Sequence, residues 1–497
     1  MLFLQEGGEP LKKSIVLTLC LVLLFPCLLS FASCGGNVAT TAAPSGTESG
    51  NVATTAAPSG TESGYVVTFL VGKNEYRITA VPGSVPACPV DPVEAAAENY
   101  AVRFIGWDKE IVAVTEDVTY TAVYGSGAEI LAARNGAKGI FTMTYDDAQY
   151  DTAKWVNEKN KKYGLKGSCM LIAGWTRVTN NLSGWTALFS DGTLEPESHS
   201  MNHDTLPAEW SGKFAEMKGN NTQPKYKVEL VDAKTRLREY FPGSDILCFA
   251  PASNVLSTYS FEVGANGQAD LSRTLADGGA EKVAQETYYA IRQGARGIQS
   301  FDPTPGFEAG GWYNLKMQGF SSFEGEEKLI AGKRWLDQAV TGPGWLIVMC
   351  HGIDGPSAKG TSPLEISEGD ADKFFAYAGE YVRSGELWSA TFGEATKYLR
   401  ERQNTTVTER CENGKIYVEM QINRTCSDGK YLDEGVFNYP LTVEVRVPEN
   451  WHTVSYRVNG KNETASVYVK NGAAYAMVNL VPGADGAETL TAIGFVN

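Results

Sequence analysis

The stretch Gly139–Ala148, which reads GIFTMTYDDA, decides the fold of the largest part of the chain. Its apolar and β-branched residues, from Ile140 to Met143, are typical of a buried strand. The strand ends on two adjacent carboxylates, Asp146 and Asp147. Their mutual repulsion must be compensated. Either both face water in a solvated loop, or a cation binds one of them and leaves the other with a tuned pKa.

Three of the four histidines in the chain favour the cation. His199 and His203 lie in the segment ESHSMNHD. Their spacing of four residues predicts that one helical turn aims both side chains at one point. His351 ends the apolar run Trp345–His351, which is typical of a second buried strand. The remaining His452 has no potential ligand beside it in the sequence and is interpreted as a structural or surface residue.

These segments resemble the polysaccharide deacetylase family, also called the NodB-homology carbohydrate esterases. The first family motif, Thr-Phe/Tyr-Asp-Asp, matches Thr144–Asp147, and the second, His-Ser/Thr-x-x-His, matches His199–His203. The last motif, Leu-x-His at a strand end, is similar to Ile347–His351. The resemblance covers residues 137–403 and implies a distorted (β/α)7 barrel. Ala250 stands where the third family motif has an arginine that orients the catalytic base.

The resemblance also implies a role for each motif residue. Asp147, His199 and His203 are expected to hold a divalent metal ion, with zinc the expected metal, and to leave positions open for water or substrate. Asp146 is expected to be the base that takes a proton from water. His351 is expected to be the acid that protonates the leaving amine or alcohol.

A fourth family motif is only partly matched, by Asp302 and Trp312, which are expected in a second layer around the site. The resulting hypothesis is a metal-dependent hydrolase that removes N- or O-acetyl groups from a glycan. Because of Ala250, the alternative is a glycan-binding pseudoenzyme with weakened turnover. A third hypothesis assigns the function to the flanking β-domains and makes the barrel a spacer. The sequence names neither the sugar nor the bond that is cut.

Alternating strand and helix patterns follow Lys138, as expected for a β/α barrel. The site residues fall at the carboxyl ends of predicted strands, where such barrels assemble their active sites. The predicted strands are 139–144, 165–173, 195–200, 245–250, 296–301, 345–350 and 386–391, and the main predicted helices are 152–163, 226–240, 281–292 and 324–339.

The first 34 residues have the pattern of a bacterial lipoprotein signal. Lys12 and Lys13 precede the uncharged, mostly apolar run Ser14–Phe31, and small residues lead to Cys34, the expected lipidation site. The alternative is an uncleaved membrane anchor. In both cases we expect the rest of the chain at the extracellular face of the bacterial envelope.

The barrel is predicted to lie between two β-rich domains. Residues 35–64 contain a tandem repeat of GNVATTAAPSGTES, which cannot bury a core and predicts a flexible tether. Residues 65–125 resemble the internalin-type B repeat of bacterial surface proteins, which implies a β-grasp-like module. Residues 404–497 carry Asn-Gly and Asp-Gly turn signals and predict an Ig-like β-sandwich. Within it, Cys411 and Cys426 could pair in an oxidising compartment.

The charge of the chain limits its partners. The net charge is -15 and no basic run is present, which argues against binding to nucleic acid. No Cys-x-x-Cys pair occurs, so a zinc site built on such a pair is excluded. We therefore expect a monomer whose partners are an acetylated glycan and, through the lipid anchor, a membrane.

Overall fold

The computed structural model describes residues 64–92, 102–203, 226–254, 256, 261–263, 269–274, 279–322, 325, 327–356, 364–412, 415–458, 461–483 and 490–492. All of them belong to one compact unit, Gly60–Asn497. Cys34, the run Ser14–Phe31 and the repeats of the tether lie outside the described residues. Among the described helices, none combines the length and the apolar character that a membrane crossing requires.

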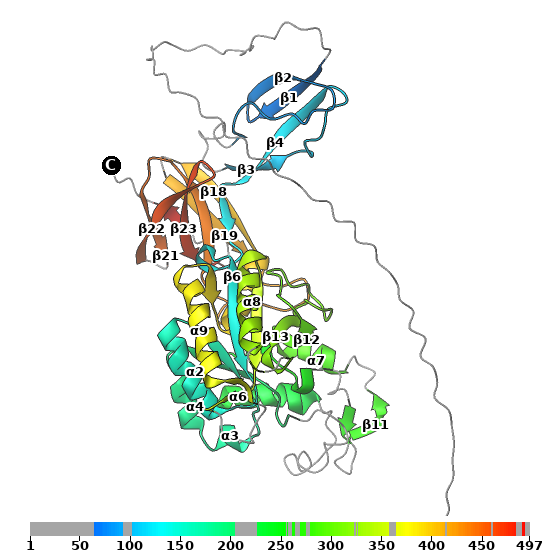
Figure 1. Ribbon diagram of the computed structural model, residues 1–497, viewed down its shortest axis with the longest axis vertical. Helices are drawn as coiled ribbons and strands as arrows, with labels where there is room; N and C mark the ends of the chain where they lie inside the picture. The colour runs from blue at the N-terminus through cyan, green and yellow to red at the C-terminus, as the bar shows by residue number, and fades with distance from the viewer. Residues whose placement is uncertain are drawn as a thin grey trace, which may run out of the picture. The chain divides into compact units, whose positions relative to one another are not determined.

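The centre of the molecule is a closed barrel of seven parallel strands, which confirms the predicted fold (Figure 1). Each strand is hydrogen-bonded to the next, and the last pairs with the first through the register Trp345↔Ile140 to Cys350↔Tyr145. Both of these strands are buried along their whole length, as the apolar and β-branched residues of β6 and the apolar run of β14 predict. In order around the barrel, the strands are β6 (Gly139–Tyr145), β7 (Gly167–Leu171), β8 (Leu194–Ser198), β9 (Cys248–Phe249), β12 (Ala290–Arg296), β13 (Leu315–Gly319) and β14 (Trp345–Cys350).

The predicted barrel strands differ from the structure in three places. The fifth strand, β12, ends where the predicted strand 296–301 would begin. Strand β13 was not predicted at all. The predicted seventh strand does exist as β17 (Leu387–Ser389), but it does not close the barrel. It pairs with the first half of β6, while β7 pairs only with the second half. β17 therefore takes the place beside β6 where β7 is not paired with it.

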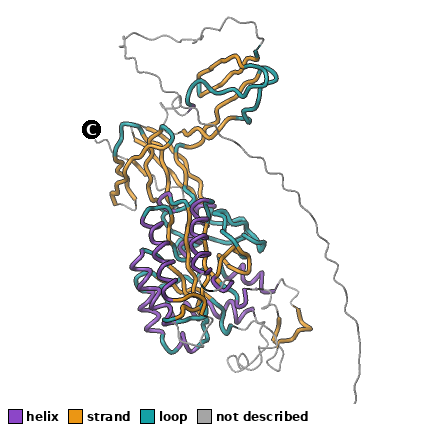
Figure 2. The backbone as a smooth tube through the Cα atoms, in the orientation of Figure 1, coloured by secondary structure: helices purple, strands orange, loops and turns teal. Residues whose placement is uncertain are grey.

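Helices surround the strands of the barrel (Figure 2). Helix α7 ends five residues before the predicted boundary, and the predicted helix 226–240 begins with a π-helical segment, Lys227–Asp232. The helices are α2 (Tyr150–Tyr163), α3 (Thr176–Thr179), α4 (Leu182–Phe189), α6 (Ala233–Tyr240), α7 (Gly279–Thr287), α8 (Glu327–Thr341), α9 (Glu368–Arg383) and α10 (Phe392–Gln403), and short 3-10 turns lie at Arg134–Gly136, Ala252–Asn254 and Phe320–Ser322.

Helix α10 packs against β6, β7 and β9, and its carboxyl end contacts residues just before β12 and β13. It begins with a capping box, in which Thr391 and Glu394 satisfy each other's backbone N–H groups. The N–H of Gly393 donates to Glu195 Oε1 at 2.6 Å. A Cβ at position 393 would lie 2.9 Å from the other carboxylate oxygen, so a side chain there would displace the Glu195 carboxylate. Arg400, near the other end of the helix, donates to the carbonyl of Tyr289, which immediately precedes β12.

The amino-terminal domain is a four-stranded mixed sheet in the order β2-β1-β4-β3. Strands β1 and β4 are parallel, and the outer pairs are antiparallel. Trp107 packs edge-on against Phe69, with ring centroids 5.1 Å apart, so it is part of the packing around this small core. The strands are β1 (Tyr65–Val71), β2 (Asn74–Ala80), β3 (Val102–Trp107) and β4 (Val118–Ser126).

The carboxy-terminal domain consists of two sheets, which agrees with the predicted β-sandwich. One sheet has the order β18-β19-β24, and the other β21-β22-β23-β20-β5. Strand β5 (Ala128–Ile130) precedes the barrel in sequence, yet it pairs with β20 through Val443↔Ile130. Cys426 is a free thiol, and the side chain of Cys411 lies outside the described residues. The other strands are β18 (Thr405–Glu412), β19 (Lys415–Ile422), β20 (Leu441–Val447), β21 (Thr453–Val458), β22 (Lys461–Lys470), β23 (Ala473–Leu480) and β24 (Leu490–Ala492), and the short pairs outside these domains are β10 (Phe261–Val263) with β11 (Ala269–Thr274) and β15 (Gly352–Asp354) with β16 (Leu364–Ser367).

Candidate metal and catalytic site

The register between β6 and β14 brings two of the sequence motifs together. Tyr145 pairs with Cys350, so the next residues of both strands, Asp146 and His351, emerge at the same end of the barrel. The N–H of Asp146 also donates to the carbonyl of Cys350 at 3.0 Å. This end carries the carboxyl termini of the parallel strands, as predicted from the sequence.

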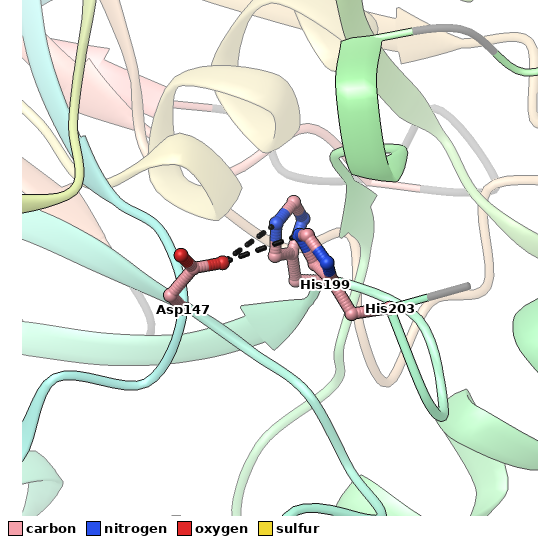
Figure 3. Close-up of side chains that lie close together, drawn as sticks. All are labelled: Asp147, His199 and His203. Atoms are coloured by element: carbon pink, nitrogen blue, oxygen red, sulfur yellow. Dashed lines mark ion pairs between the residues drawn. The ribbon is translucent and has the colours of Figure 1, made fainter. Parts of the chain in front are cut away.

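Three potential metal ligands converge at this end of the barrel (Figure 3). Asp147 Oδ1 lies 3.5 Å from His199 Nε2 and 3.3 Å from His203 Nε2. One ligand atom of each residue lies within 4.8 Å of the others. Asp147 and His199 are buried, and His203 is partly exposed, so the cluster can be reached from solvent.

The two histidines do not lie on a helical turn, and this part of the prediction was wrong. Residues 199–203 form an irregular loop after β8, in which Ser200 and His203 have φ values of 74° and 62°. On the facing strand end, Asp147 and Ala148 have φ values of 67° and 50°. Non-glycine residues with such values cost of order 1–3 kcal/mol each and gather at functional sites. The two imidazoles thus converge because the backbone of this loop turns at Ser200 and His203, and not because they share a helical face.

The chemistry of His199 fits a metal ion at this position. Its Nδ1 lies 2.7 Å from the carbonyl oxygen of Ala250, so Nδ1 carries the proton and Nε2 keeps its lone pair. Nε2 is buried, makes no hydrogen bond in the described part of the chain and faces Asp147 Oδ1. A lone pair opposite a carboxylate oxygen is unfavourable unless a proton or a cation lies between them. Burial and the neighbouring His199 lower the pKa of His203 to about 4, which leaves it neutral and able to bind a metal.

Asp146 contacts a buried arginine that the sequence analysis missed. Arg292, on β12, is fully buried, and its Nη2 donates to Asp146 Oδ1. Burial alone would raise the pKa of Asp146, but the positive charges of Arg292 and His351 lower it below its usual value. Asp146 is therefore an ionised carboxylate, and its second oxygen, Oδ2, lies 3.9 Å from His199 Nε2.

The arginine missing at position 250 is thus supplied by another strand. The sequence offered Arg296 and Lys138 as candidates to hold Asp146, but Lys138 pairs with Glu386 at 2.9 Å. Arg296 forms no ion pair with Asp146 among the described contacts. Ala250 itself is buried and holds His199 through its backbone carbonyl.

His351 is held by a second residue that the sequence analysis missed, Glu365. The parallel pairing of β15 and β16, which places Gly352 opposite Leu364, brings the Glu365 carboxylate beside the imidazole. Glu365 Oε1 lies 2.9 Å from His351 Nδ1, and Oε2 accepts the backbone N–H of His351 at 3.1 Å. Burial lowers the pKa of His351, but the hydrogen bond to Glu365 and the charge of Asp146 outweigh it and raise that pKa to about 9. His351 is therefore protonated near neutral pH and keeps Nε2–H available as a proton donor.

The structure does not bring the two weaker candidates to this cluster. Asp302 is exposed and pairs with Arg402 at 2.7 Å. Trp312 is buried, and its Nε1 donates to Gln403 Oε1 at 3.0 Å. Both partners lie at the end of α10, beside the amino end of β13 and away from the carboxyl ends that carry Asp147.

The two missed residues left different traces in the sequence. Arg292 had none, because the predicted helix 281–292 continued through the true start of β12. Glu365 lies between two apolar residues, Leu364 and Ile366, in a short strand pattern. A charged residue between apolar neighbours in a strand is a signal for a buried partner, although it does not name that partner.

Comparison with known proteins gives low similarities. No family model matches the sequence. A gellan lyase from Bacillus sp is 21% identical over 371 residues, which span 71% of this chain and 13% of that protein. The chain thus corresponds to a small part of the length of this curated relative.

Several solved structures resemble about half of the chain. They include a polysaccharide deacetylase from Bacillus cereus, with 11% identity, a TM-score of 0.29 and coverage of 51% of this chain and 92% of that one. A family 4 carbohydrate esterase from Streptomyces lividans, in complex with acetate, has 10% identity, a TM-score of 0.29 and coverage of 51% and 93%. A variant of the peptidoglycan deacetylase from Bacillus subtilis has 13% identity, a TM-score of 0.29 and coverage of 53% and 94%. Because these values are low, we base the function on the geometry of the site.

Proposed function

We propose that this chain is a metal-dependent carbohydrate esterase that removes acetyl groups from a polysaccharide or oligosaccharide. The observation that carries the proposal is the convergence of Asp147, His199 and His203 at one point, with a carboxylate base and a protonated imidazole beside them. This donor set suits zinc, which binds imidazole and carboxylate and keeps open positions in catalytic sites.

The chain's own residues would divide the proton transfers between them. A divalent ion held by the three ligands supplies Lewis acidity, which makes water more acidic and an acetyl carbonyl more electrophilic. Asp146 takes the proton of the attacking water on Oδ2, because its Oδ1 is occupied by Arg292. His351 gives a proton from Nε2 to the leaving amine or alcohol, because Glu365 occupies Nδ1.

The alternative of a pseudoenzyme was based on the missing arginine at Ala250. Arg292 removes that reason, since it makes the contact with the base from a neighbouring strand. Acetate release from acetylxylan, acetylated chitooligosaccharide and peptidoglycan separates the two hypotheses. We expect release from at least one of them, and the loss of that release after chelation. Binding of a glycan without any acetate release would favour the pseudoenzyme.

The metal is tested directly by its stoichiometry. We expect the purified chain to bind about one zinc ion, and His199→Ala and His203→Ala to abolish the binding while the circular dichroism spectrum is kept. His452→Ala is the matched control, because that histidine lies in the carboxy-terminal domain. Stoichiometric zinc in the His199/His203 double variant would contradict the metal site.

We further propose that the chain acts at the extracellular face of the bacterial envelope, anchored through lipidated Cys34. The lysine pair, the apolar run and the small residues before that cysteine support this location. Cys34→Ser should release the protein from membranes or shift it to an uncleaved form. A variant that fractionates and migrates like the wild type would rule out Cys34 as the anchor.

A further inference from the structure

A buried glutamate lies beneath the loop that carries both histidine ligands. Glu229 is fully buried. Its Oε2 accepts the backbone N–H groups of Met201 and Asn202 at 3.1 and 2.9 Å. Its Oε1 accepts the side-chain Nδ2–H of Asn202 at 2.8 Å. One carboxylate thus binds three N–H groups between His199 and His203.

A π-helical segment and the hydroxyl of Tyr288 hold Glu229 against the loop that carries His199 and His203. Glu229 lies in the π-helical segment Lys227–Asp232. Such π-helical turns are rare in proteins, and those that occur often lie at functional sites. The hydroxyl of Tyr288 contacts both the carbonyl of Leu230 and Ser198 Oγ, each at 2.8 Å. It therefore links the residue after Glu229 to the residue before His199.

The opposite side of the loop is fixed by the chain after β7. The N–H groups of Ala173 and Gly174 donate to the carbonyls of Ser200 and Met201 at 3.0 and 2.8 Å. The indole Nε1 of Trp175 donates to the carbonyl of Asn202 at 3.2 Å. The carbonyls of residues 200–202 thus face the segment after β7, and the N–H groups of Met201 and Asn202 face Glu229. Without an acceptor at position 229, the buried N–H of Met201 would lose its partner.

We infer that Glu229 is a positioning residue for the metal site, which sets the metal affinity by holding His199 and His203 in the geometry that binds the ion. This inference rests on the proposed function, because it assumes that the two imidazoles are ligands. The loop has positive φ at Ser200 and His203, which an unsupported loop would avoid. Groups that orient metal ligands in this way typically change metal affinity by about 10- to 100-fold when they are removed.

The test measures zinc affinity of the full chain by competition with a chromophoric chelator. We expect Glu229→Ala to weaken the affinity by about 10- to 100-fold and to change the visible spectrum of the Co²⁺-loaded protein, which reports the geometry of the ligands. Glu229→Gln keeps one acceptor oxygen for the two backbone N–H groups, and the Asn202 amide can turn to face the new NH₂ group. It should restore most of the affinity.

Glu401 provides a matched control. It is also fully buried, and its carboxyl oxygens accept a backbone N–H, that of Tyr439, both at 3.1 Å. Glu401→Ala should lower the melting temperature and leave zinc affinity and the Co²⁺ spectrum unchanged. A merely structural role of Glu229 predicts the same behaviour for both alanine variants.

The outcomes separate this inference from the proposed function. Zinc affinity of Glu229→Ala within about threefold of the wild type, or an equal loss in Glu401→Ala, would overturn the role of Glu229 alone. If Glu229→Ala does not fold, Glu229→Asp replaces it. Its shorter side chain cannot reach both backbone N–H groups, and unchanged zinc affinity in that variant would overturn the inference. A wild-type chain that binds no zinc would overturn the metal site and, with it, this inference.

Discussion

The two ends of the barrel both contain a buried arginine paired with an aspartate, but the two pairs have different surroundings. At the amino end, Arg400 donates through all three nitrogens, to Asp428 and to the carbonyl of Tyr289, and its guanidinium lies over the Trp312 ring at 4.1 Å. At the carboxyl end, Nη2 of Arg292 contacts Asp146 and Nη1 contacts a methionine sulfur, while Nε has no hydrogen-bond partner among the described residues.

The comparison separates a pair that holds the structure together from one that holds a reactive group. The Arg400–Asp428 pair satisfies its donors, receives the Tyr313 hydroxyl at 2.7 Å, and joins the barrel to the loop after β19. The Arg292–Asp146 pair leaves one carboxylate oxygen facing the metal ligands. Polar groups left without partners in a buried site are costly, so they indicate function where they persist.

The largest expected effect would come from breaking the pair at the amino end. Asp428→Ala leaves Arg400 buried without its counter-charge, which typically costs about 3–5 kcal/mol. We expect a loss of that size in urea unfolding, with zinc affinity of the folded fraction unchanged. A loss of unfolding free energy below about 1 kcal/mol, the scale of an exposed pair, would mean that the Arg400–Asp428 pair does not hold the structure together.

Replacing the carboxylate at the other end should act on the chemistry. Asp146→Asn keeps the shape of the side chain and leaves Asp147, His199 and His203 to bind zinc, but it removes the proton acceptor. We expect the kcat for acetate release to fall roughly a hundredfold or more, the usual contribution of a positioned base. Zinc content, measured on the same samples, should stay at the wild-type level. Full activity in this variant would show that Asp146 is not the base.

The role of Arg292 can be sharpened through pH dependence. Burial raises the pKa of Asp146, and the charge of Arg292 lowers it, so that Arg292→Gln should let the effect of burial dominate. Because the base is active only when ionised, the acid limb of the kcat/KM profile should move to higher pH, and activity near neutral pH should fall. An acid limb at the wild-type position would contradict this coupling.

The pair formed by His351 and Glu365 should give a pH-dependent stability in the metal-free protein. The folded pKa of about 9 lies above the ordinary value of 6.5. The stabilisation is therefore complete below about pH 6.5 and is lost as the pH rises through 9. We expect the melting temperature of the chelated wild type to fall over this interval and Glu365→Gln to reduce that fall. Equal pH dependence in both proteins would contradict the pairing.

The smallest expected effect concerns the backbone beside the metal ligand. Ala148 is buried with φ of 50°, a conformation that glycine adopts without cost. Ala148→Gly should therefore change stability by less than about 1 kcal/mol and in the stabilising direction, because relief of the strain offsets the lost methyl group. Ala153→Gly in helix α2 is the control and should destabilise by about 1 kcal/mol. Comparable destabilisation by both substitutions would show that the turn is unstrained.

The sequence predicted the parts of the site that are continuous with strong strand patterns. β14 is apolar throughout and β6 combines apolar with β-branched residues, so their ends, and with them Asp146, Asp147 and His351, could be placed. β13, which reads LKMQG, has too few apolar residues to be recognised, and its burial comes only from its neighbours in the closed barrel. The contact of Arg292 with Asp146 joins residues far apart in the chain, and no local pattern encodes it.

The pairing of β5 with β20 constrains the order in which the protein can be completed. Val443 and Ile130 are more than 300 residues apart, and the whole barrel is threaded between them. A chain emerges amino terminus first, either from the ribosome or from an export channel. In either case β5 has no partner strand until the carboxy-terminal domain has emerged and β20 can pair with it. The barrel can close before then, since its seven strands all lie between the two partners. The pairing of β5 with β20 is therefore a late folding event. It joins the segment before the barrel to the domain after it, once the barrel has formed.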